Sequence, residues 1–300
     1  DGRRILDPYL NCVRVLQPPN DAWLQSDPYL VALLAQETTS AGHSVLVFCN
    51  SRSVCESVAT NLARHLGVIP ETPREGHKRP RDGSEEDLAS VSGTRDRIVE
   101  DLRQIQSSNV GAHYTLEELM PKGIAFHHAG LAEEEKHLVE HAFNCGAVSV
   151  LCCTPTLSLG VNLPARRVIF YKPYIPTLSH PIESCHYRQM AGRAGRAGID
   201  DAGESILVAQ PQISQYSASS LAKLIRDAPA PITTCLAEGK RGMSRAMLEA
   251  IATGSVSQVG DVKKFIMSTL LCATDGFEAA AHATRTALQS LLQRQDGFIQ

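Results

Sequence analysis

The most distinctive stretch of the chain is YRQMAGRAGRAG, residues 187–198. Within it Arg193 and Arg196 stand three residues apart, a spacing that places both guanidinium groups on one face of a helix. Gly192 and Gly195 carry no Cβ, so a bulky group can approach the backbone closely at these two positions. The stretch therefore indicates a helix end built to receive a large, negatively charged ligand.

The chemistry of this stretch suits a nucleoside triphosphate. The planar fork of arginine binds phosphate in a bidentate manner, and Gln189, four residues before Arg193, adds an amide to the same face. An arginine placed at a γ-phosphate stabilises the charge that grows there during cleavage. A second interpretation stays open at this point: a flexible Gly/Arg segment could contact nucleic-acid backbone without any chemistry.

Composition limits the classes of protein. The chain has 300 residues, 43% of them hydrophobic and 20% charged, which is ordinary for a water-soluble globular protein with a sizeable core. The net charge of −3 means that any nucleic-acid site must be local. Nine cysteines form no C-x-x-C pair, which predicts reduced thiols in an intracellular protein rather than metal ligands or disulfides. No apolar run is long enough to span a membrane.

Short apolar runs alternate with amphipathic helical patterns along most of the chain. The runs predict buried strands at residues 44–49, 124–127, 147–153, 167–171 and 204–209. Helical patterns and their stop signals predict helices near residues 27–41, 53–66, 94–106 and 132–143. Buried strands that alternate with helices indicate an α/β fold with a parallel sheet and flanking helices.

The sequence patterns also divide the chain into segments. Residues 1–40 are interpreted as a lead-in segment and residues 41–212 as the α/β domain. Residues 68–92, rich in proline, glycine and charge, are predicted to be a disordered insertion; their KRPR is either a weak nuclear-localisation patch or a solvated loop. Residues 213–300 are predicted to form a small, mostly helical second domain.

Two local patterns concern possible sites. Ser53 and Glu56 match a capping box at the start of the second helix. His127 and His128 are adjacent at the end of a strand, so their side chains should point to opposite faces and are poor joint ligands of one metal ion. No metal site is expected in this chain.

Four phrases resemble the motifs IV, IVa, V and VI of superfamily 2 helicases. In chain order they are SVLVFCNSR (44–52), HHAGL (127–131), CTPTLSLGVNLP (153–164) and YRQMAGRAGR (187–196). More narrowly, GVNLPARRVI, QMAGRAGRAGID and GESIL resemble the branch that holds the helicase domain of DNA polymerase theta and related repair helicases. The resemblance implies a second RecA-like domain followed by a winged-helix domain.

The resemblance also implies site residues, carried over by motif position. The residues expected at the ATP γ-phosphate are Arg196, as the arginine finger, Arg193 and Gln189; Gly160 and Asn162 are expected to face the nucleotide. Those expected to bind the backbone of single-stranded DNA are Ser51, Arg52, Thr154 and Thr156. Tyr174 lies between motifs V and VI, where the resembling helicases carry a β-hairpin that splits the duplex.

The chain departs from the family pattern in one important respect. It contains neither G-x-x-x-x-G-K-[ST] nor an acidic D-E-x-[HD] box, so it lacks the phosphate cradle and the magnesium ligands. In the family these groups belong to a first RecA-like domain on the N-terminal side. ATP with Mg²⁺ is therefore the expected cofactor, and the chain is expected to be inactive by itself.

The resulting prediction is the C-terminal motor half of an ATP-dependent DNA helicase, and the resemblance implies a role in DNA repair. Its expected partners are single-stranded or branched DNA and the missing first RecA-like domain, with no membrane, and its expected location is the nucleus. Two alternatives stay open: half of an RNA helicase, and a non-catalytic module that binds nucleic acid or protein.

Overall fold

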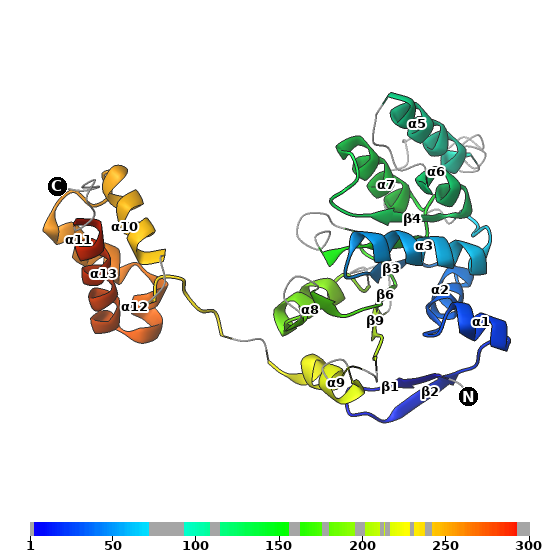
Figure 1. Ribbon diagram of the computed structural model, residues 1–300, viewed down its shortest axis with the longest axis horizontal. Helices are drawn as coiled ribbons and strands as arrows, with labels where there is room; N and C mark the ends of the chain where they lie inside the picture. Colours follow the sequence, from blue (N-terminus) through cyan, green and yellow to red (C-terminus); the bar gives the residue numbers. More distant parts are fainter. Residues whose placement is uncertain are drawn as a thin grey trace. The chain divides into compact units, whose positions relative to one another are not determined.

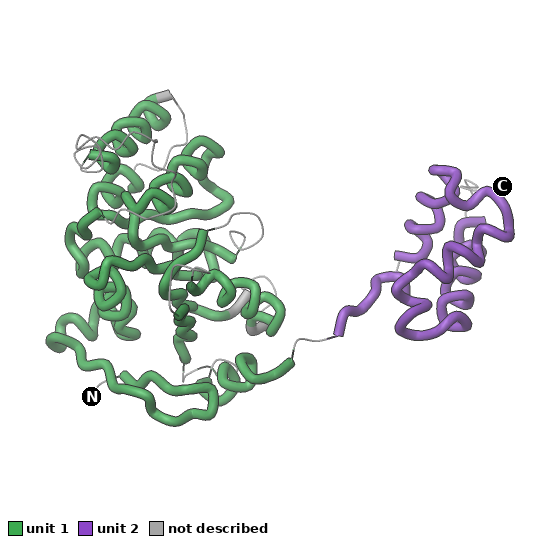
Figure 2. Tube along the Cα trace, turned by 180° about the vertical axis from the view of Figure 1, so that it is seen from behind, with its two compact units in different colours: residues 1–229 green, residues 230–300 purple. Residues whose placement is uncertain are grey.

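The computed structural model describes residues 3–71, 93–108, 115–155, 163–175, 180–195, 202–210, 213, 217–228, 231–237 and 242–292. The chain divides into two compact units, Asp1–Pro229 and Ala230–Gln300 (Figure 2). Each unit buries its own cluster of hydrophobic side chains. No helix in the described part of the chain is long and apolar enough to cross a membrane.

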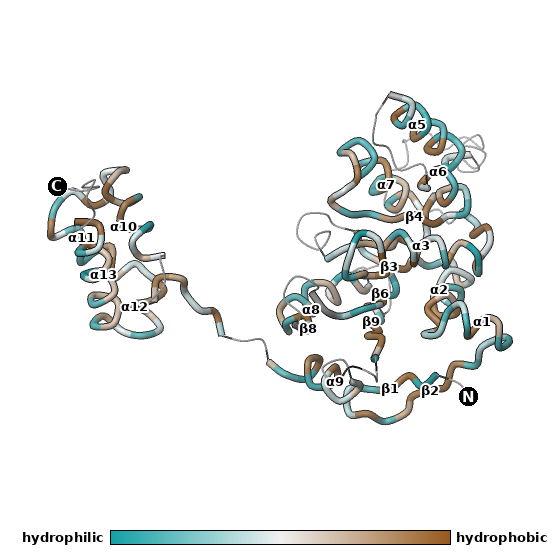
Figure 3. The backbone as a smooth tube through the Cα atoms, viewed as in Figure 1, coloured by the Kyte–Doolittle hydropathy of each residue, from teal (hydrophilic) through white to brown (hydrophobic). Residues whose placement is uncertain are grey.

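The first unit is built on a five-stranded sheet in the order β4-β5-β3-β6-β9 (Figure 1). The strands are β3 (Val45–Phe48), β4 (Ile124–His127), β5 (Val150–Cys153), β6 (Arg167–Phe170) and β9 (Glu204–Leu207). All four pairings between neighbours are parallel. Every residue of β3, β4 and β5 is buried, and the brown tube at β3 in Figure 3 shows this hydrophobic run. The predicted α/β fold with five parallel strands is confirmed.

Helices connect and cover these strands. They are α2 (Val31–Ser40), α3 (Arg52–Leu66), α5 (Thr94–Ser108), α6 (Thr115–Leu119), α7 (Glu133–Cys145), α8 (Ser184–Ala191) and α9 (Ala218–Arg226), with a 3-10 turn at Met120–Lys122. Helix α3 packs on β4 and β5, and α7 packs on β4. Gly67 ends α3 with a positive φ of 63°, which favours glycine, as its position in the sequence predicts.

The predicted capping box at the start of α3 is wrong. Ser51 is the N-cap residue, and its hydroxyl oxygen accepts a hydrogen bond from the Val54 amide at 3.3 Å. Ser53 therefore lies inside the first turn. Glu56 turns away from the helix start and pairs with His128 instead. The sequence contains serines at both 51 and 53, and the helix begins after the first of them.

The segment interpreted as a lead-in belongs to the first unit. Strands β1 (Arg3–Leu6) and β2 (Cys12–Leu16) form an antiparallel hairpin, and α1 (Asp21–Ser26) follows it. Leu16 is buried in the main core, and Arg14 pairs with Glu37 of α2 at 2.8 Å. The helix predicted at 27–41 begins later, at Val31, because Pro28 and the left-handed Leu30 (φ 54°) interrupt it.

The predicted insertion and the division into domains also differ in their limits. Ile69 is buried and donates its amide hydrogen to the Lys122 carbonyl at 3.0 Å, so the first residues of the proposed insertion belong to the fold. Residues 72–92, the remainder of that insertion, lie outside the described residues. Helix α9, which the sequence assigned to the second domain, groups with the first unit and contacts α8.

The second unit is helical in its described part. It contains α10 (Gly242–Ala252), α11 (Val259–Met267), α12 (Leu270–Asp275) and α13 (Phe277–Leu292), and α13 packs against the other three. Helices α11 and α12 are separate, because Thr269 caps α12 by accepting a hydrogen bond from the Cys272 amide. The residues described in this unit include no strand, so the wing implied by the resemblance stays a prediction.

Candidate nucleic-acid and nucleotide sites

The carboxyl ends of the parallel strands gather the residues expected to bind nucleic acid. Ser51 and Arg52 follow β3 and begin α3, whose backbone amides and dipole favour an anion at this end. The Arg52 side chain is exposed, and no described residue hydrogen-bonds or pairs with it. A free guanidinium at the positive end of a fifteen-residue helix is suited to a phosphate group.

Thr154 occupies the neighbouring strand end. It directly follows β5, is buried, and donates its amide hydrogen to the His127 carbonyl at 3.2 Å. This bond continues the ladder between β4 and β5 by one residue. Thr154 is therefore held at the same end of the sheet as Ser51. The other residues expected from this motif, Thr156, Gly160 and Asn162, lie outside the described residues.

Each of the two adjacent histidines has its own glutamate partner. His127 Nε2 lies 2.9 Å from Glu140 Oε1 of α7, and His128 Nε2 lies 2.9 Å from Glu56 Oε1 of α3. The side chains thus reach helices on opposite faces of β4, in agreement with the alternation along a strand. Burial lowers the pKa of His127, although the hydrogen bond that Glu140 accepts from its ring acts in the other direction. The sequence did not point to Glu140, and it placed Glu56 in a capping box.

Arg193 is fixed by its backbone beside the amino end of β6. Its amide donates to the Met190 carbonyl at 3.1 Å, and its carbonyl accepts from the Ala165 amide at 2.9 Å. The Gly195 amide returns to the Ala165 carbonyl at 2.7 Å. These bonds fix the path of the backbone after α8 beside the amino end of β6. Gln189 is exposed on α8, and Arg196 lies outside the described residues.

A glycine makes this path possible. A Cβ on Gly203, just before β9, would lie 2.2 Å from the Ala194 carbonyl oxygen and 2.6 Å from the Gly195 nitrogen. Atoms at such distances overlap, so only glycine allows the backbone after α8 to cross the start of β9 so closely. Gly203 is the first residue of the GESIL phrase, and the crossing gives a physical reason for glycine there.

The two groups of expected residues lie at opposite ends of the sheet. Cys153 pairs with Phe48, and Phe48 with Phe170, whereas Ala165 stands two residues before β6 begins. The six steps from Ala165 to Tyr171 span about 20 Å at the usual rise of a strand. The nucleic-acid candidates Ser51, Arg52 and Thr154 are thus brought together, and Arg193 is kept apart from them.

The segment between motifs V and VI contains a short hairpin. Strands β7 (Tyr174–Ile175) and β8 (His180–Pro181) are antiparallel, with Tyr174 opposite Pro181. An antiparallel pair is what the resemblance implies at this place. The contact of Tyr174 with a base pair remains a prediction.

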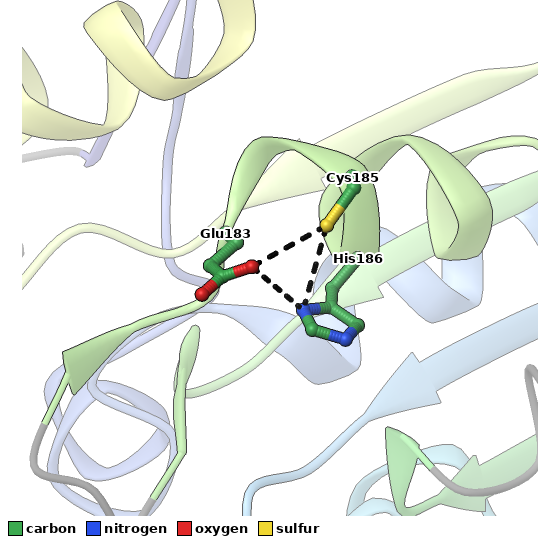
Figure 4. Close-up of side chains that lie close together, drawn as sticks. All are labelled: Glu183, Cys185 and His186. Carbon is green, nitrogen blue, oxygen red and sulfur yellow. Dashed lines mark hydrogen bonds and ion pairs between the residues drawn. The ribbon is translucent and has the colours of Figure 1, made fainter. Parts of the chain in front are cut away.

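One group of three possible metal ligands occurs among the described residues, although no metal site was expected. Oxygen, sulfur and nitrogen atoms of Glu183, Cys185 and His186 lie within 4.8 Å of one another at the start of α8 (Figure 4). All three residues are exposed, and hydrogen bonds among them account for their closeness. The positive end of the α8 dipole opposes a cation here, so we assign no metal to this group.

Comparisons with known proteins identify two domain families in the chain. Residues 97–198 match the model of the helicase conserved C-terminal domain, and residues 203–300 match that of a helix-turn-helix domain. The chain is 36% identical over 275 residues to DNA polymerase theta of Mus musculus, which covers 91% of this chain and 10% of that protein.

Two further relatives are similar to a comparable extent. DNA polymerase theta of Drosophila melanogaster is 37% identical over 266 residues, covering 85% of this chain and 12% of the relative. The ATP-dependent DNA helicase Hel308 of Methanocella arvoryzae is 33% identical over 269 residues, covering 89% of this chain and 33% of the relative. The chain thus spans a third or less of the length of these three relatives.

Both matched domains occur in the same order as the two parts of the chain, and the shared stretch includes the four helicase phrases. The chain therefore carries the helicase conserved C-terminal domain followed by a helix-turn-helix domain, and over most of its length it is similar to the polymerase theta and Hel308 branch of superfamily 2 helicases.

Proposed function

We propose that this chain is the C-terminal motor half of an ATP-dependent DNA helicase that acts in DNA repair in the nucleus. One observation carries the proposal: the free Arg52 and the residues around it lie at the carboxyl end of the sheet, while Arg193 lies at the amino end. A rigid sheet with a DNA-binding site at its carboxyl end and a nucleotide-binding site at its amino end can transmit a movement from one site to the other. The names of the relatives, which include an ATP-dependent DNA helicase, support the proposed helicase function.

One set of residues in this chain would act on the nucleotide, and another would bind the nucleic acid. Arg193 and Arg196 would neutralise charge at the γ-phosphate, and Gln189 would orient the phosphate or the attacking water. Ser51, Arg52 and Thr154 would bind the phosphodiester backbone, which carries no sequence information and so allows translocation on any sequence.

ATP with Mg²⁺ would supply the free energy when it is bound between this chain and a preceding RecA-like domain. The groups that this chain offers to the triphosphate are two arginines and a side-chain amide, and these suit the γ-phosphate alone. No phosphate-cradling loop or magnesium-binding hydroxyl is found in the 300-residue sequence. We therefore propose that the ligands of Mg²⁺ lie on the other domain and that this chain alone does not hydrolyse ATP.

The test uses the 300-residue chain with fluorescein-labelled oligonucleotides of twenty thymidines or twenty uridines. We expect it to bind the thymidine oligonucleotide, with affinity that falls as salt is raised from about 50 to 200 mM because counterions are released. Hydrolysis of ATP should be absent with or without DNA. Preference for the uridine oligonucleotide would favour the RNA-helicase alternative.

An Arg196→Ala variant is the control for hydrolysis. Turnover that survives in this variant identifies a contaminating enzyme. Turnover that the variant loses would overturn the claim that half of the ATP site lies elsewhere. Absence of binding to either oligonucleotide at the lower salt concentration would refute the nucleic-acid role.

A further inference from the structure

His128 is the most fully enclosed polar side chain near the nucleic-acid candidates. Its exposed fraction is 1%, and its ring stacks on Phe126 at a centroid distance of 5.2 Å. Its Nδ1 accepts the amide hydrogen of Gly130 at 3.1 Å, so the ring proton must be on Nε2. Nε2 in turn donates to Glu56 Oε1 at 2.9 Å. Glu56 thereby selects the tautomer that can hold the loop containing Gly130.

Gly130 fits tightly between this histidine and Arg52. A Cβ on Gly130 would lie 3.1 Å from His128 Nδ1 and 3.3 Å from Arg52 Nη1. These distances are shorter than ordinary carbon contacts, so the absent Cβ leaves just enough room for the guanidinium to lie against the loop. The loop that follows β4 is therefore one wall of the place occupied by Arg52.

Arg52 and Glu56 also share a helix. They stand four residues apart at the start of α3 and so face the same side, yet Glu56 pairs with His128 and not with Arg52. Since its nearest acidic neighbour on the helix is engaged, the guanidinium stays available to an external anion. No described residue pairs with Arg52.

We propose that Glu56 is a positioning residue for binding of single-stranded DNA. It acts through His128 and Gly130, which hold the loop 128–131 against Arg52 and present the guanidinium to a phosphodiester. This inference rests on the proposed function, because it takes Arg52 to be a DNA contact. Glu56 itself touches no DNA in this arrangement.

The experiment measures binding of the 300-residue chain to a fluorescein-labelled oligonucleotide of twenty thymidines at several salt concentrations. Arg52→Ala should weaken binding roughly threefold to tenfold and make the salt slope shallower by about 0.7, the value for one phosphate contact on a single strand. Glu56→Ala should reproduce most of both changes. Glu56→Gln keeps an acceptor for Nε2 and should bind within about twofold of wild type.

The double variant R52A/E56A distinguishes positioning from an independent effect. If Glu56 acts through Arg52, the double variant binds no worse than Arg52→Ala. The matched control is Glu140→Ala, which removes the same kind of histidine partner from α7 on the other face of β4. It should leave the Arg52-dependent part of the salt slope unchanged.

Gly130→Ala supplies a second route to the same result, should Glu56→Ala unfold the chain. Its added Cβ should displace Arg52 and weaken binding while Glu56 and His128 are intact. Equal weakening by Glu56→Ala in the wild-type and Arg52→Ala backgrounds would overturn the inference, as would wild-type binding by both Glu56→Ala and Gly130→Ala. If Arg52→Ala itself has no effect, the DNA contact assigned under the proposed function fails instead.

Discussion

Gly203→Ala tests the claim that a backbone crossing positions Arg193. The ideal Cβ would lie 2.2 Å from the Ala194 oxygen, about 1 Å inside ordinary contact, and both neighbours are backbone atoms that cannot swing aside. The segment after α8 must then move away from Gly203. Its two hydrogen bonds with Ala165, at 2.9 and 2.7 Å, would be lost or stretched.

The magnitude follows from these contacts. Overpacking costs about 1–3 kcal/mol, and the two hydrogen bonds contribute about 0.5–1.5 kcal/mol each. The free energy of unfolding of the first unit should therefore fall by roughly 2–6 kcal/mol. For a unit of this size, that corresponds to a melting temperature lower by roughly 4–24 °C. In a complete helicase the displaced Arg193 should also reduce ATP hydrolysis more than DNA binding.

Calorimetry or thermal denaturation of the 300-residue chain measures the effect. Gly260→Ala is the control, since Gly260 lies in α11 of the second unit with no atom within 4 Å of an added Cβ. Alanine there should stabilise the second unit by up to about 1 kcal/mol. A Gly203→Ala chain that melts within about 1 °C of wild type would refute the steric reasoning.

Four further predictions concern other parts of the molecule. Replacing residues 174–180 with Gly/Ser in a complete helicase should abolish unwinding and spare DNA-stimulated ATP hydrolysis; equal loss of both would contradict a strand-separating role. Arg196→Lys keeps the charge but loses the bidentate fork, so hydrolysis should fall roughly 10³-fold with little change in nucleotide affinity. Arg95→Met should destabilise the first unit by roughly 2–4 kcal/mol in denaturant titrations, because the buried Arg95 donates to the carbonyls of Ala147 and Ile69. Burial lowers the pKa of His127 in the folded chain, so stability should fall as pH drops below about 6.5, where only the unfolded chain gains a proton, and His127→Gln should flatten that pH profile.

The sequence alone determined the sheet and its class. Five apolar runs predicted five parallel strands because a strand buried on both faces needs hydrophobic residues at every position, as in residues 45–48. Gly67 likewise marked a helix end that the structure confirms, since few other residues adopt a positive φ there without strain. The four helicase phrases led to the family that the comparisons then supported.

Only the tertiary structure decided which side chains meet. Glu56 looked like half of a capping box, because local spacing contains no information about His128, which is 72 residues away in the chain. The hairpin β1–β2 escaped detection for a related reason: its outward residues, such as Val13 and Val15, are apolar and exposed, so the strands lack a clear alternating pattern. The separation of Arg52 from Arg193 is also a tertiary property, since it depends on which end of a parallel strand each loop follows.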